Sequence, residues 1–122
     1  MSIKKLTIAV TALLLSACAT VPDSLNDQQL AQARNVTFIK PYELSRTDVE
    51  FTSRGEVVGE SCQANVLAPR ATQERALLEL KIAAAELGAN AVVLQSCQQP
   101  AGGGCKKLWV CTGTAHDMRS LQ

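Results

Sequence analysis

The sequence has few aromatic residues and almost no net charge. Only four of its 122 residues are aromatic, and 12 Lys and Arg residues against 11 Asp and Glu residues leave a formal net charge of +1. A near-neutral chain has no long-range field that would draw it to nucleic acid or to a strongly acidic partner. A chain of this length forms one small domain, which excludes a multidomain enzyme.

The sequence also lacks the recognisable motifs of catalysis. Its one histidine, His116, lies near the C-terminus beside Asp117, where a histidine is usually solvated. There is no nucleophile elbow, no phosphate-binding loop motif and no set of carboxylates at a defined spacing. The three glycines at 102–104 are not followed by a predicted helix, so they do not form a phosphate cradle. The sequence therefore predicts a protein that is not an enzyme and needs no cofactor.

The N-terminus carries an export signal. Lys4 and Lys5 precede an apolar run over residues 6–15, and Ser16 and Ala17 are small, which is the layout of a secretory signal peptide. The run is too short to span a bilayer as a helix, which needs about 20 apolar residues. We therefore assign residues 1–17 to a cleaved signal peptide.

The end of this signal matches the lipobox of bacterial lipoproteins, with the residues Leu15, Ser16, Ala17 and Cys18. The lipobox cysteine is lipidated and becomes the first residue of the mature chain. Each buried CH₂ of an acyl chain contributes about 0.8 kcal/mol, so several chains anchor the protein firmly. Ala19 is not the Asp that favours retention in the inner membrane in enteric-type lipoproteins, so the similarity to that sorting pattern implies the outer membrane.

Four further cysteines remain for the exported domain, namely Cys62, Cys97, Cys105 and Cys111. In an oxidising compartment such cysteines become disulfides, and their spacing alone leaves three connectivities open. Their gaps do not form the paired knuckles of a structural zinc site, and no cysteine opens a predicted helix as in thiol oxidoreductases. The sequence therefore predicts two structural disulfides and no metal site.

The hydrophobic pattern predicts one long helix and several strands. Apolar residues recur at helical spacing over residues 72–87, with Glu74 near the start and Gly88 directly after the end. A nearly continuous apolar strand is predicted over 91–97, and a final strand over 107–115 is expected to run antiparallel to it. Shorter extended segments are predicted earlier, at residues 36–39, 49–51 and 56–62.

These elements predict an α+β fold. We expect a small sheet of three to four strands, with one helix packed on one face and two disulfides as cross-links. The polar segment after Cys18 has no sustained apolar face and is interpreted as a tether. The predicted division is a signal peptide over 1–17, a lipid anchor and tether over 18–47, and a periplasmic domain over 48–122 whose residues after His116 form a tail.

An ordered set of four cysteines with specific flanking residues follows the lipobox in this sequence. The segments are GEVVGESCQA (55–64), GANAVVLQSC (88–97), GC (104–105) and VCTGTA (110–115). Together with the lipobox at Cys18, they resemble the RcsF family of outer-membrane lipoproteins. The resemblance implies that Cys62 bonds to Cys105 and that Cys97 bonds to Cys111, and that a disulfide isomerase assists this non-consecutive pairing.

The resemblance also implies a function, because members of this family sense envelope stress for the Rcs phosphorelay. It implies delivery with outer-membrane β-barrel proteins by the assembly protein BamA, and contact with IgaA, an inner-membrane repressor. Lys106, Lys107 and Trp109 are the candidate contact residues, although a core position is more usual for tryptophan. The alternative is a non-signalling structural or assembly lipoprotein that binds the β-barrels.

Overall fold

A four-stranded sheet organises residues 25–121, the part of the chain that the computed structural model describes. The strand order is β1-β3-β4-β2; β1 pairs with β3 in parallel, and the other neighbours are antiparallel. The predicted α+β class is confirmed. The elements in chain order are α1 (Asp27–Arg34), β1 (Thr37–Ile39), the 3₁₀-helix η1 (Pro41–Ser45), β2 (Val49–Gln63), α2 (Gln73–Glu86), β3 (Ala91–Gln98) and β4 (Lys107–Ser120).

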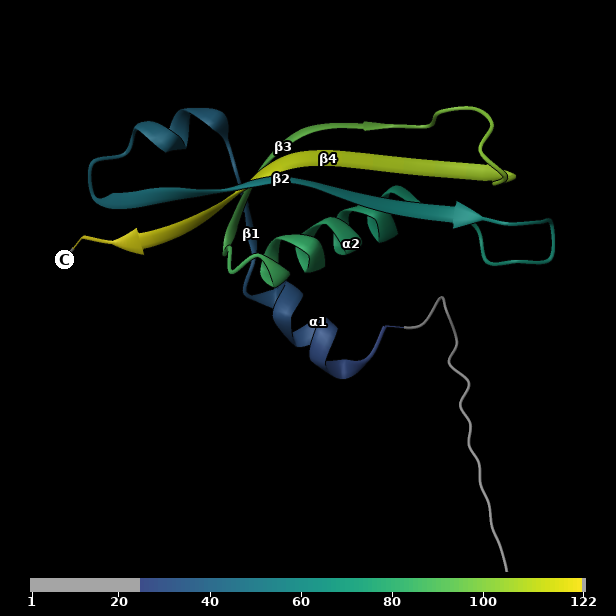
Figure 1. The fold of residues 1–122 in the computed structure, drawn as a ribbon, viewed down its shortest axis with the longest axis horizontal. Helices are drawn as coiled ribbons and strands as arrows, with labels where there is room; N and C mark the ends of the chain where they lie inside the picture. The colour runs from purple at the N-terminus through teal and green to yellow at the C-terminus, as the bar shows by residue number, and fades with distance from the viewer. Residues whose placement is uncertain (1–24, 122) are drawn as a thin grey trace, which may run out of the picture.

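The two α-helices lie on one side of the sheet (Figure 1). α2 lies along the sheet face, and α1 packs against α2. The segment that contains η1 lies on the opposite side, at the end of the sheet where the chain finishes. Among residues 25–121, no helix has the length and hydropathy needed to cross a membrane.

The ends of α2 follow from its sequence. Thr72 is the N-cap, and its Oγ1 accepts a hydrogen bond from the Arg75 N–H at 3.1 Å. Gly88 has a φ of +80°, and the next residue, Ala89, donates its N–H to the Ala84 carbonyl at 3.0 Å. This is the Schellman arrangement, for which glycine is the favoured residue. The helix predicted over residues 72–87 is thus confirmed.

The core between α2 and the sheet is built from small side chains. Ala76, Leu80 and Ala84 of the helix are fully buried, and they pack against a sheet face that includes Val57 and Val92. The helix comes so close to β2 that a Cβ at Gly59 would collide with the backbone of residues 76 and 80. Gly59 therefore sets the distance between helix and sheet.

Residues 26–47 belong to the folded domain, which corrects the predicted tether. Asn26 and Gln29 form a capping box at the start of α1. Ala33 and Val36 are buried, and β1 extends the sheet by pairing with β3. The boundary predicted at residue 48 is too late, because these apolar side chains become buried through partners that lie far away in the sequence.

β2 and β4 are longer than predicted. The segments expected over 49–51 and 56–62 form one strand, β2, with an irregularity in its register between Ser53 and Gly55. β4 continues to Ser120 and pairs with β2 over its whole length. The predicted tail after His116 is therefore wrong for residues 117–120, because the two segments expected over 49–51 and 56–62 form one continuous strand whose first residues pair with them.

His116 is a residue of the sheet and not a solvated tail residue. Its ring packs edge-on to Phe51, with 6.1 Å between ring centroids and an interplanar angle of 83°. Both ring nitrogens are buried without a hydrogen-bond partner among the described residues. Next to it, the Asn90 side chain donates to the Met118 carbonyl at 2.9 Å and accepts from the Met118 N–H at 2.7 Å. These contacts hold the second half of β4 in place.

The contact at Gly59 gives a first prediction. We expect Gly59→Ala to lower the free energy of unfolding by about 2–3 kcal/mol, because α2 must move away from β2 to accommodate the new methyl group. Urea denaturation followed by far-UV circular dichroism measures this. The matched control is Val58→Thr, at the exposed neighbouring position, which should change stability by less than about 0.5 kcal/mol. Equal stability of the two variants would contradict the proposed packing.

Candidate functional site

The four cysteines form the two predicted disulfides. Cys62, near the end of β2, bonds to Cys105 in the loop before β4, with 5.6 Å between their Cα atoms. Cys97 and Cys111 face each other on β3 and β4, with 4.0 Å between their Cα atoms. The pairing that the resemblance implied is confirmed, whereas the spacing of the cysteines had left three pairings open.

The two disulfides have different surroundings. Cys111 is fully buried in the core under α2, and Cys97 packs against the same core. Cys62 is exposed, and its partner Cys105 is half-buried at the end of the sheet. One bridge therefore strengthens the core, and the other joins the end of β2 to the loop before β4. Within residues 25–121, no three potential metal ligands lie together.

The loop after β2 and the chain around the start of β4 lie next to the Cys62–Cys105 bridge. They form a surface that we call the tip, which comprises Val66, Leu67, Arg70, Lys106 and Lys107. All five side chains are exposed. Two of the candidate contact residues, Lys106 and Lys107, are thus at the tip. Trp109 is half-buried and packs against the core, as the sequence favoured.

Sequence reasoning missed the other three tip residues. Two adjacent apolar residues, Val66 and Leu67, lie in the loop between β2 and α2. Their position in a loop was the sequence signal that both are exposed, because two neighbouring apolar side chains in a loop commonly have no core to pack into. Leu67 is 93% exposed and Val66 69% exposed.

Hydrogen bonds hold the loop of the tip in a defined turn. The Asn65 side-chain oxygen accepts from the Leu67 N–H at 2.9 Å, and the Asn65 carbonyl accepts from the Ala68 N–H at 3.1 Å. The Gln63 side chain donates to the Ala68 carbonyl at 3.3 Å. The Lys106 N–H donates to the Gln63 carbonyl at 2.6 Å, which joins the two loops. Leu67 is therefore held outward by a built turn.

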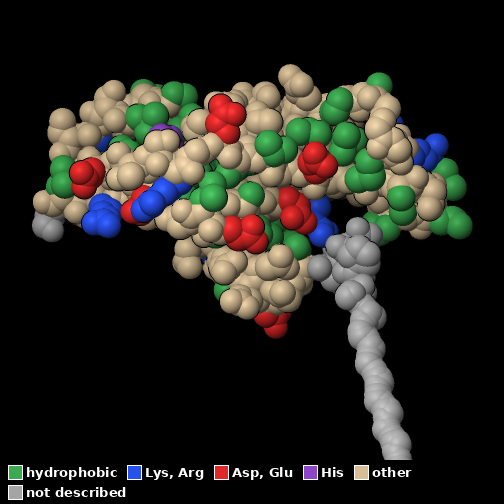
Figure 2. Space-filling model, in the orientation of Figure 1, with side chains coloured by type: hydrophobic (Ala, Val, Ile, Leu, Met, Phe, Trp, Pro, Cys, Tyr) green, Lys and Arg blue, Asp and Glu red, His purple; other side chains and the backbone are tan. Residues whose placement is uncertain are grey.

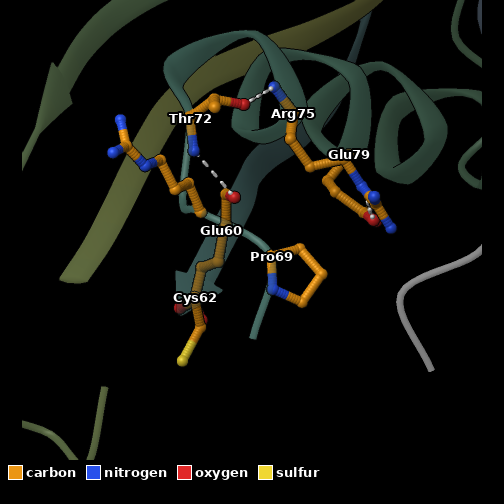
Figure 3. Close-up of a pocket in the computed structure, with 8 residues that line it drawn as sticks. Glu60, Cys62, Pro69, Thr72, Arg75 and Glu79 are labelled. Carbon is orange, nitrogen blue, oxygen red and sulfur yellow. Dashed lines mark hydrogen bonds and ion pairs between the residues drawn. The ribbon is translucent and has the colours of Figure 1, made fainter. Parts of the chain in front are cut away.

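An open cavity of about 450 Å³ lies beside the tip, between the end of β2 and the start of α2. Figure 3 shows how its polar groups pair with one another. The Thr72 N–H donates to the Ser61 hydroxyl at 3.1 Å, and Arg75 contacts Glu79 at 3.0 Å. The cavity therefore offers a polar surface beside the tip.

A clear pKa shift occurs away from the tip, at the connection between η1 and β2. Hydrogen bonds from Arg46, at 2.6 and 2.9 Å, lower the pKa of Asp48. A carboxylate with a lowered pKa stabilises the fold above its unfolded pKa, and this contribution is lost as the pH falls through the folded value. The pair is fully exposed, so its effect on stability is small.

Comparison with known proteins identifies the family. Residues 16–119 match the RcsF lipoprotein family. The chain is 31% identical over 127 aligned positions to the outer membrane lipoprotein RcsF of Escherichia coli strain K12, covering 92% of this chain and 95% of that protein. The same values hold for the outer membrane lipoprotein RcsF of Escherichia coli O6:H1. The chain belongs to the RcsF lipoprotein family.

The RcsF-family match includes Cys18 and all four disulfide-bonded cysteines. As in its RcsF relatives, the location is the outer membrane, to which the folded domain is attached by lipid. The lipidation site predicted at Cys18 lies outside the described residues. Membership therefore agrees with the sequence prediction of an outer-membrane lipoprotein, and the structure adds the disulfide-linked tip.

The bridges of this RcsF-family domain give a second prediction. Replacing each cysteine pair by alanine should lower the free energy of unfolding by about 4 kcal/mol for Cys62 and Cys105 and about 3 kcal/mol for Cys97 and Cys111. The difference follows from their sequence separations of 43 and 14 residues. Urea denaturation without reductant provides the measurement, and the wild-type protein in reductant is the control. An unchanged unfolding midpoint in either variant would refute a stabilising role for that bridge.

Proposed function

We propose that this outer-membrane lipoprotein senses envelope stress and activates the Rcs phosphorelay by contact with an IgaA-like inner-membrane repressor. The observation that carries the proposal is membership of the RcsF lipoprotein family over residues 16–119. The tip and its neighbouring cavity support it further, because they offer an exposed, disulfide-linked surface for a partner. The protein then acts by contact and not by chemistry.

Anchoring and delivery complete the proposed mechanism. Cys18 carries the lipid, and the assembly protein BamA delivers the chain together with outer-membrane β-barrel proteins. When envelope damage blocks that delivery, the domain reaches the repressor instead. The bond between Cys62 and Cys105 spans Cys97 in the sequence, so consecutive pairing during export gives the wrong bridges. A disulfide isomerase then corrects them.

Lys106 and Lys107 are the proposed contact residues for the repressor. Both are exposed, and neither forms an ion pair within residues 25–121. Two unpaired cations on a rigid surface suit an acidic region of a partner. Trp109, which follows the two lysines on β4, takes a supporting role because it packs against the core.

A third prediction concerns the anchor. We expect Cys18→Ser to move the protein from the outer-membrane fraction to the soluble periplasmic fraction and to change the stress response. The fold should be retained, because the described domain begins after this residue. Fractionation, a capsule-gene reporter and circular dichroism measure the three effects. An unchanged location and response would contradict the proposed anchor.

A fourth prediction separates signalling from the alternative, a non-signalling structural or assembly lipoprotein bound to β-barrels. Crosslinking in stressed cells should capture an IgaA-like protein, and Lys106→Gln/Lys107→Gln should reduce that capture about tenfold because it removes two interfacial charges. Lys40→Gln, at an exposed position away from the tip, is the matched control. Recovery of β-barrels alone, without induction of capsule genes on overproduction, would favour the alternative.

A further inference from the structure

The tip places exposed apolar side chains next to exposed basic side chains. Leu67 and Val66 project from a hydrogen-bonded turn into solvent, and three cations lie around them: Arg70, Lys106 and Lys107. These three cations line one hollow of the surface together with Gln63 and Val66. Figure 2 shows hydrophobic side chains gathered at the right-hand end of the molecule next to Lys or Arg side chains.

The charge of the tip is not balanced from within the domain. None of its three cations forms an ion pair among residues 25–121. Two carboxylates, Glu60 and Glu79, line the neighbouring cavity together with Arg70, and neither forms an ion pair with it. Apolar residues at the apex of a loop with cations around them are the pattern by which peripheral proteins bind anionic lipid surfaces.

The short segment between the lipid anchor at Cys18 and the start of the fold favours a membrane as the binding partner of the tip. Asn26, where the fold begins, is eight residues after Cys18, and eight extended residues span at most about 28 Å. In Figure 1, α1 begins at its right-hand end, on the side of the molecule toward which the β2–α2 loop also points. A short tether from that side keeps the tip close to the membrane surface that holds the lipid.

We propose that the tip docks on the anionic phospholipid surface of the membrane that anchors the protein. Leu67 and Val66 enter the interfacial region, while Arg70, Lys106 and Lys107 contact phosphate groups. This inference rests on the proposed lipid anchor at Cys18. It also adds a regulatory step to the proposed function, because Lys106 and Lys107 are covered while the tip is docked and become available to a protein partner only when it lifts.

The test uses the mature lipidated chain in vesicles of phosphatidylethanolamine with phosphatidylglycerol, and in vesicles of phosphatidylcholine alone. Flotation reports anchoring, and amide hydrogen exchange over residues 64–71 reports docking. We expect exchange in this segment to be about fivefold slower on the anionic vesicles than on the neutral ones. Leu67→Asn, and separately Arg70→Gln/Lys106→Gln/Lys107→Gln, should remove that difference without preventing flotation.

Two controls keep the result specific. Leu121→Asn removes an exposed leucine, and Lys40→Gln an exposed cation, both away from the tip, so neither should change exchange over residues 64–71. A chain that fails to float contradicts the anchor. A chain that floats but exchanges equally fast on both vesicles contradicts docking. If the tip variants then weaken capture of an IgaA-like periplasmic domain only, the tip binds a protein and the membrane proposal is wrong.

Discussion

The close contact between α2 and the sheet is the constraint on which the rest of this domain depends. The helix rests on β2 at Gly59, and the side chains around it are small: Ala76, Ala84 and Ala115 are fully buried. Small side chains allow close packing, but they remove little apolar surface from water, and hydrophobic stabilisation scales with that surface. A core of this kind needs additional stabilisation from other sources.

The disulfides supply that stabilisation in two different places. Cys97–Cys111 joins the two central strands inside the core, whereas Cys62–Cys105 joins the two loops of the tip. The second bridge therefore does more than stabilise the fold. It holds Lys106 next to the turn that bears Leu67, so that apolar and basic groups face outward together as one surface. A binding surface that is already ordered loses less conformational entropy when a partner or a membrane contacts it.

The sequence predicts local features of this fold well and long-range features poorly. Helix α2 could be located because its caps, Thr72 and Gly88, act within a few residues of the helix itself. The extended segment predicted over 36–39 is β1, but no local pattern reveals that it pairs with β3, more than fifty residues later. The same reason explains the extension of β4 past His116. The disulfide pairing came from family resemblance. Only two of the five tip residues, Lys106 and Lys107, were predicted, because the exposure of Leu67 and the position of Arg70 beside it are tertiary properties.

Because the fold begins at Asn26, the segment between Cys18 and the folded domain has only a short reach. From Cys18 to Asn26 the chain spans at most about 28 Å, and a bilayer with its headgroups measures about 40–45 Å. These eight residues are shorter than a bilayer is thick, so the lipid anchor proposed at Cys18 keeps the folded domain close to the membrane that holds it. In the function proposed above, the response to stress depends on which surface of the domain faces that membrane. The tip is well suited to be that surface, because Leu67 lies there beside cations that form no ion pair among residues 25–121.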